Sequence, residues 1–90
     1  MRPTWETLAA SLVIDAPEHL RAAVANGVSN VSHYYRCHGW PVKHDVICDG
    51  LTKRLAFDCR DGAYVADLTE LKTGAPLWSW SVKAEEARQG

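Results

Sequence analysis

The sequence predicts an α+β domain, with two or three N-terminal helices packed on one face of a four-stranded antiparallel β-meander. Two observations predict this class: apolar residues recur at a helical period in the first half of the chain and alternate with polar residues in the second half. The length of the chain is a further observation, because 90 residues are enough for only one domain. We therefore expect a single domain over residues 1–90, with helices at about 4–38, the meander at about 42–82 and a polar tail at 83–90.

The first helix is expected to begin after Thr4, whose hydroxyl can cap it, and Glu6 in the first turn favours the helix dipole. Its apolar stripe falls at positions i, i+3, i+4, i+7 and i+8 and consists of Trp5, Leu8, Ala9, Leu12 and Val13. This spacing predicts a helix that buries one face against a core.

A second helix start is expected at residues 15–18, where Asp15 is the N-cap and Glu18 completes a capping box. The apolar stripe that follows contains Leu20, Ala23, Val24, Gly27, Val28, Val31 and Tyr35. Asn26-Gly27 is the weak point of this segment, because glycine both lowers helix propensity and ends helices. Either the helix ends there and a third one begins, or it runs on to Cys37.

Three predicted turns set the register of the strands. Asp61-Gly62 is a strong signal for a two-residue hairpin, which places Cys59 opposite Tyr64, Phe57 opposite Ala66 and Leu55 opposite Leu68. A three-residue loop at 72–74 extends the same apolar face and sets Leu68 opposite Trp78, Ala66 opposite Trp80 and Tyr64 opposite Val82. A four-residue loop after Gly50 places Val46 opposite Phe57 and His44 opposite Cys59.

Charge and composition exclude several classes of function. Ten Lys and Arg residues stand against eleven Asp and Glu, whereas a domain that grips nucleic-acid phosphates through bulk charge needs a clear cationic excess. No apolar run is long enough for a membrane helix, and the N-terminus has no signal-peptide pattern. Three cysteines cannot close an intrachain disulfide framework, so we expect free thiols in a reducing compartment and a cytoplasmic, stand-alone protein.

The cysteines and most histidines gather in one stretch, at His33, Cys37, His38, His44, Cys48 and Cys59. His33 and Cys37 lie one helical turn apart, a spacing typical of zinc sites, and the predicted register would add His44 and Cys59. His44 and Cys48 cannot share one tetrahedral metal on a strand, where four residues span about 13 Å. Buried free thiols are the simpler interpretation, so we expect no metal and no cofactor.

Two further motifs are incomplete. Residues 23–32 look like part of a helix-turn-helix with Gly27 at its turn, but its inward positions would be His33 and Arg36, where apolar residues are needed. The chain also lacks a Gly-rich phosphate loop, a Gly-x-Ser-x-Gly elbow and a His-Glu-x-x-His pair. Cys37 and His33 have the spacing of a nucleophile and its base, although such pairs arise by chance. We therefore expect no enzyme and no catalytic residues.

Residues 33–40 gather the side chains that dominate protein-binding hot spots. Two Tyr, one Trp, one Arg and two His fall within this segment, and a helix can bury only one side of it. The expected partner-contact residues are Tyr34, Arg36, His38 and Trp40. The alternative is that the aromatic residues only close the corner between helix and sheet.

Aspartates predict a second candidate surface. Asp45, Asp49, Asp58 and Asp67 fall out of phase with the apolar face, so they should share the exposed side of the sheet. Asp58 and Asp67 are the expected contact residues of an acidic surface that would dock a basic partner. Lysine and arginine residues on the same strands dilute the charge, so a solvated mixed-charge face is the alternative.

Together these observations predict a small, non-catalytic, protein-binding regulator or inhibitor that occupies a surface of a larger host protein or complex. Small reading frames of this kind are common in phages and mobile elements, and an anti-defence protein, such as an inhibitor of a host CRISPR complex, is the concrete example we expect. The alternative function is a zinc-stabilised or helix-turn-helix-like regulator that binds nucleic acid. Membrane binding is not expected.

Overall fold

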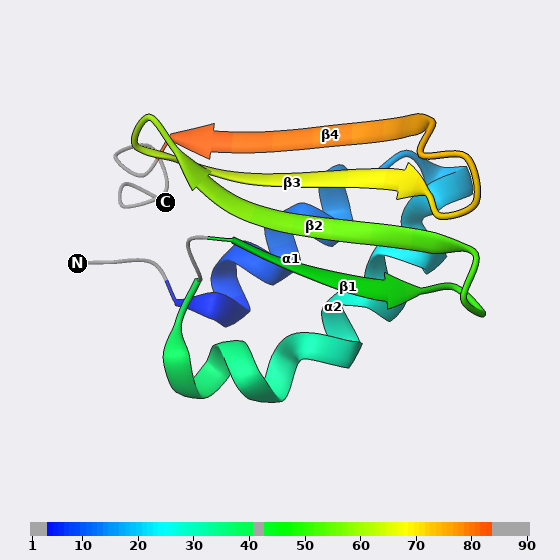
Figure 1. Ribbon diagram of the computed structural model, residues 1–90. Coiled ribbons are helices and arrows are strands. Elements are labelled where there is room, and N and C mark those ends of the chain that lie inside the picture. The colour runs from blue at the N-terminus through cyan, green and yellow to red at the C-terminus, as the bar shows by residue number, and fades with distance from the viewer. Residues whose placement is uncertain (1–3, 41–42, 84–90) are drawn as a thin grey trace.

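The computed structural model describes residues 4–40 and 43–83, and within them two helices precede four strands (Figure 1). The elements are α1 (Trp5–Asp15), α2 (Glu18–His38), β1 (Lys43–Cys48), β2 (Lys53–Arg60), β3 (Ala63–Glu70) and β4 (Pro76–Lys83). The strands form one antiparallel sheet in the order β1-β2-β3-β4, which confirms the α+β class and the meander. Of the tail predicted at 83–90, Lys83 is the last residue of β4, and residues 84–90 lie outside the described part of the chain.

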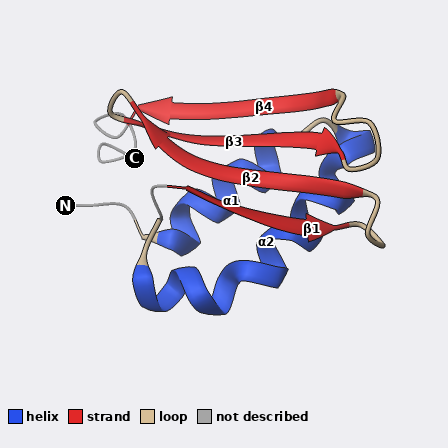
Figure 2. Ribbon diagram, viewed as in Figure 1, coloured by secondary structure: helices blue, strands red, loops and turns tan. Residues whose placement is uncertain are grey.

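Figure 2 shows both helices on the same side of the sheet, and no other described element lies over its opposite side. The core lies between these two layers, because the apolar stripes of both helices and one face of the strands are buried together. Its largest fully buried side chains are Tyr35, Phe57, Leu12, Leu55, Leu68, Val24 and Cys48. The fold therefore leaves the outer face of the sheet, and the outward side of α2, as its main exposed surfaces.

The junction between the helices differs from the expected capping box. α1 continues through Asp15, and the N-cap of α2 is Pro17, which makes no side-chain cap hydrogen bond. Arg21 instead satisfies the end of α1 by donating to three of its terminal carbonyl oxygens, those of Val13, Ile14 and Ala16. The Asp15 carboxylate accepts a hydrogen bond from Trp80 Nε1 at 3.0 Å, so it fixes α1 to β4. The prediction of Asp15 as an N-cap is therefore wrong.

α2 is a single helix, so the break considered at Asn26-Gly27 does not form. Gly27 faces the sheet, and a Cβ atom at this position would lie 2.8 Å from Leu55 Cδ2 and 3.4 Å from Cys48 Sγ. The missing side chain thus lets the helix backbone approach β2 closely. Glycine is used here for packing, although its local preference is for a helix end.

Two of the three predicted registers are confirmed. The pairs across β2–β3 and β3–β4 are those expected, including Phe57 opposite Ala66 and Ala66 opposite Trp80. The β1–β2 register is wrong by two residues, because His44 lies opposite Phe57 and Val46 opposite Leu55. The turn covers residues 49–52, with positive φ angles at Asp49, Gly50 and Leu51 (54°, 65° and 66°), so pairing begins at Cys48 and Lys53. A shift of two residues leaves every side chain on its expected face.

Phe57 tests the core and the confirmed register. Its ring is fully buried and packs edge-to-face against Trp5, Tyr35 and Trp40. Truncation to alanine removes these contacts and leaves a cavity, so we expect Phe57→Ala to lower the free energy of unfolding by about 3–5 kcal/mol. Urea denaturation followed by tryptophan fluorescence measures this loss, and a change below about 1 kcal/mol would contradict the packing described.

Gly27 tests the close approach of α2 to the sheet. In an open helix, alanine would stabilise the chain by about 0.8–1 kcal/mol relative to glycine. Here the added methyl group meets the buried Leu55 side chain, and overpacking costs about 1–3 kcal/mol. We therefore expect Gly27→Ala to lower the midpoint of urea denaturation. The loss should shrink in a Leu55→Ala background, where the methyl group has room, and a Gly27→Ala variant more stable than wild type would refute the contact.

Candidate functional site

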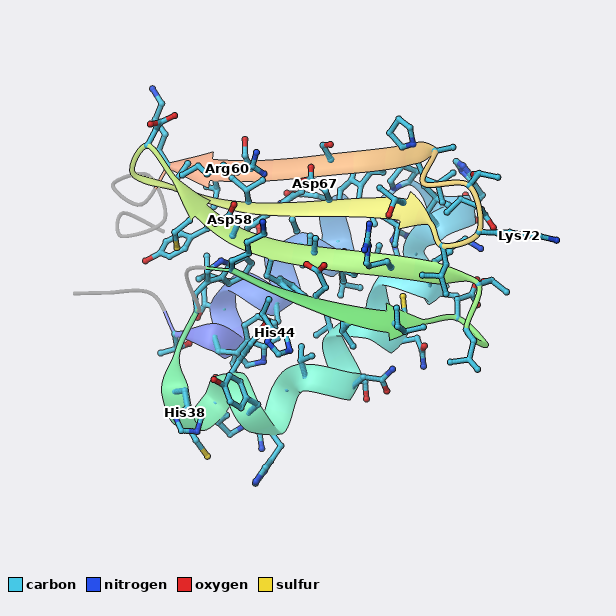
Figure 3. The ribbon with its side chains drawn as sticks, in the orientation of Figure 1. His38, His44, Asp58, Arg60, Asp67 and Lys72 are labelled. Carbon is cyan, nitrogen blue, oxygen red and sulfur yellow. The ribbon has the colours of Figure 1, made fainter. Side chains whose placement is uncertain are left out.

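The six predicted contact residues fall in two separate places. Tyr34, Arg36 and His38 lie on α2, and Trp40 follows it at the corner that leads to β1. Asp58 and Asp67 lie on β2 and β3, on the face of the sheet away from the helices, and Figure 3 shows them beside Arg60 and distant from His38. The structure therefore presents two candidate surfaces rather than one.

The first surface consists of the ring of Tyr34 and the two histidine rings that contact it, those of His38 and His44, and we call it the Tyr34 surface. The Tyr34 ring lies 4.5 Å from the His38 ring, one helical turn away, and 5.6 Å from the His44 ring of β1, at an interplanar angle of only 18°. All three residues are exposed, and Tyr34 retains 48% of its accessible area. A large aromatic side chain is thus held between two elements while its surface stays open to solvent.

His44 was not among the predicted contact residues. Its place beside Tyr34 depends on how β1 lies along α2, and the sequence pattern had placed His44 opposite Cys59 instead of Phe57. The correct β1–β2 register would have placed His44 where it lies. That register could be predicted only by expecting a left-handed conformation at Leu51, which leucine rarely adopts.

Arg36 and Trp40 do not join the Tyr34 surface. Arg36 Nε lies 4.0 Å from Glu6 Oε1 of α1, and both side chains are more than half exposed, so this ion pair contributes little to stability. The Trp40 indole packs against the rings of Phe57 and Trp80 at 5.2 and 6.0 Å, and its Nε1 donates to the Asp58 carbonyl oxygen at 3.0 Å. Trp40 thus closes the corner between helix and sheet, so substituting it would disturb folding as well as any binding.

The second surface is the outer face of the sheet, where one arginine joins both predicted aspartates. Arg60 lies 3.1 Å from Asp58 Oδ2 through Nε and 2.9 Å from Asp67 Oδ2 through Nη2. Asp67 also accepts a hydrogen bond from Ser79 at 2.8 Å. A shallow open depression of about 540 Å³ lies beside this network. Because the carboxylates are paired with a cation, the arrangement favours the mixed-charge interpretation over an acidic docking surface.

The cysteines do not gather around the histidines as the predicted register suggested. Cys37 is exposed, Cys48 is buried and Cys59 is partly buried, and Cys59 lies opposite Tyr64. Within residues 4–40 and 43–83, no group of three or more His, Cys, Asp or Glu side chains could hold a metal ion. The unbroken α2 also means that the turn of a helix-turn-helix is not formed at Gly27.

Comparisons with known protein families, curated proteins and solved structures find no match to this chain. In the part of the chain that the structure describes, no helix is both long and apolar enough to cross a membrane. The function must therefore be inferred from the side chains and their arrangement.

Tyr35 lies directly beneath the Tyr34 surface and is fully buried. Its hydroxyl has no hydrogen-bond partner among the described residues. Burial, and to a lesser degree the neighbouring Tyr34 and Asp45, raise the pKa of this phenol well above its usual range. Burial also raises the pKa of the Cys48 thiol. Both groups therefore remain protonated at neutral pH, and both side chains pack in the core.

These two buried acids predict a loss of stability in alkaline solution. The unfolded chain releases their protons near the ordinary values of 9.0 for cysteine and 10.0 for tyrosine, whereas the folded chain holds them to higher pH. The stabilisation is therefore complete at neutral pH and is lost as the pH rises above 9.0. Urea denaturation at a series of pH values measures the slope.

The Tyr35→Phe variant separates the contribution of Tyr35 to this alkaline loss of stability from that of Cys48. It removes a buried hydroxyl without a partner, so we expect the variant to be more stable than wild type at neutral pH by about 1–3 kcal/mol. Its alkaline loss of stability should also be smaller. A less stable Tyr35→Phe variant would show that the hydroxyl makes a favourable interaction.

Proposed function

We propose that this protein is a small, non-catalytic, protein-binding regulator that acts by occupying a surface of a larger partner protein or complex. The observation that carries the proposal is the Tyr34 side chain, which is 48% exposed although two histidine rings hold it in place. Tyrosine offers a large contact area at a small cost in rotamer entropy, and ordering before binding lowers that cost further. The Tyr34 surface is therefore the proposed centre of the contact.

The chemistry of the two less exposed thiols, Cys48 and Cys59, supports a non-catalytic role. A nucleophilic cysteine needs a lowered pKa, whereas burial raises the pKa of both Cys48 and Cys59. The depression on the outer sheet face is open and shallow, unlike the enclosed pockets that bury a substrate. Both features suit a protein that works through its surface.

The more specific proposal is an inhibitor that acts in the cytoplasm of a host cell. Its target would be a host protein or complex, and an anti-defence protein of a phage or mobile element, directed against a CRISPR complex, is the case that we propose. Two features support this proposal: the chain carries an ordered aromatic contact surface, and its charge of -1 gives no bulk attraction to nucleic acid.

Tyr34→Ala is the direct test of the proposed contact. We expect this variant to weaken binding to the partner by about 1–4 kcal/mol, because a central aromatic contact is lost, while its melting temperature stays near that of wild type. The partner is first captured from host cells with wild-type protein and identified by mass spectrometry. The affinity of each purified variant for it is then measured by calorimetry.

Ile14→Ala is the matched control, because Ile14 is an apolar residue near the C-terminal end of α1 that is 70% exposed. It should bind like wild type. Asp58→Lys and Asp67→Lys test the other surface in the same assay. If these charge reversals weaken binding and change its salt dependence while Tyr34→Ala does not, the contact lies on the outer sheet face and the proposal for Tyr34 fails.

A further inference from the structure

The two edge strands of the sheet, β1 and β4, leave different residues pointing outward. Residues that flank a two-residue hairpin form a hydrogen-bonded pair, and this pair is Arg60 and Ala63. The backbone N–H and C=O groups of successive residues point alternately to the two sides of a strand. The Arg60–Ala63 pair therefore fixes the side to which the backbone groups of the regularly paired residues point. The backbone groups that point away from the sheet are those of Lys43, Asp45 and Ile47 in β1, and of Ser79, Ser81 and Lys83 in β4, where the regular pairing with β3 begins at Trp78.

Helix α2 covers the edge of β1. Asn30 Nδ2 donates to the carbonyl oxygen of Ile47 at 3.3 Å, and Asn26 Oδ1 accepts from the N–H of Asp49 at 2.6 Å. β1 also carries the charges of Lys43 and Asp45. A covered edge and charged side chains are the means by which natural sheets prevent pairing with another strand.

In the part of the chain that the structure describes, no helix covers the edge of β4, and the only charged residue of this strand is Lys83 at its end. Among the described residues, no backbone or side-chain hydrogen bond reaches the outward groups of β4. The strand holds six consecutive uncharged residues between Pro76 and Lys83, and Figure 1 shows it at the edge of the sheet opposite β1. Trp78 and Val82 pack against the core from this edge but are only partly buried. An unpaired strand of this length and composition is a template for an added strand.

The sequence of β4 is complementary to itself. An antiparallel pairing about a two-fold axis at Trp80 places Ser79 opposite Ser81 of a second copy, with the outward backbone groups of both residues facing each other. The same pairing places Trp78 opposite Val82 of the second copy, so that the two partly buried apolar residues cover each other. A strand of a different protein would satisfy the same backbone groups, but the absence of charge and the matched apolar pair favour a second copy.

We propose that two copies of this chain associate through their β4 strands and form one continuous eight-stranded antiparallel sheet. The pairing joins Ser79 of each copy to Ser81 of the other. It leaves the Tyr34 surface of each copy, at the opposite edge of its sheet, available for a partner. The proposal does not depend on the proposed function.

Multi-angle light scattering after gel filtration tests the association over a range of protein concentrations. Wild type should reach twice the mass of one 10.0 kDa chain. Ser81→Pro removes an N–H that points outward and leaves the bonds to β3 intact, so it should return the mass to one chain. Asp45→Pro makes the same change at the outward position of β1 and should remain a dimer. Circular dichroism confirms that each variant is folded.

Two double variants test the register independently of proline. Ser79→Lys with Ser81→Lys places like charges directly opposite each other across the proposed pair, so it should be monomeric. Ser79→Lys with Ser81→Asp places opposite charges there and should remain dimeric. A wild-type mass of one chain at every concentration would overturn the proposal, and so would a dimer that survives Ser81→Pro. Equal masses for the two double variants would overturn the pairing of Ser79 with Ser81.

Discussion

The close approach of α2 to β2 at Gly27 is the constraint on which the rest of the structure depends. A glycine facing Leu55 lets the helix lie against the sheet, and the residues on either side of it then meet β1. Asn26 and Asn30 reach the backbone at the end of that strand. Two turns beyond Gly27, Tyr34 meets His44 of the same strand. One missing side chain thus sets both the cover of a sheet edge and the position of the exposed aromatic rings.

The two candidate surfaces differ in how their side chains are held. On the outer sheet face, Arg60 already pairs with both carboxylates, so a partner that binds one of them must first displace Arg60 from it. Around Tyr34, ring stacking orders the side chain without consuming its hydroxyl or its outer face. A side chain that is already ordered loses little entropy on binding, and groups that are not paired within the protein need not be released first. Binding to such a surface therefore yields a larger net free energy.

Much of the fold could be predicted from the sequence, because local patterns and tertiary packing agree in the second half of the chain. Asp61-Gly62 specifies a turn, the turn specifies the register, and the register places apolar side chains on one face. Prediction failed where the backbone departs from the local preference of its residues. Leu51 adopts a left-handed conformation that leucine disfavours, and Gly27 continues a helix that its propensity would end.

The candidate site was predicted less well than the fold for the same reason. The identity of Tyr34 and His38 as exposed residues follows from the helical period, since only one side of α2 can be buried. Their neighbour His44 comes from a strand whose register depends on the β1–β2 turn, and Trp40 faces inward because it completes an aromatic cluster drawn from both layers. Such long-range contacts leave no periodic signal in the sequence.

The hydrogen bond from Trp80 to Asp15 joins side chains that are 65 positions apart, and both helices precede every strand. During synthesis the apolar stripes of α1 and α2 therefore leave the ribosome before any of the sheet that will cover them. The chain can bury these stripes only after β2, β3 and finally β4 have emerged. The nascent helices are consequently the stage at which this chain is most open to chaperones and to aggregation.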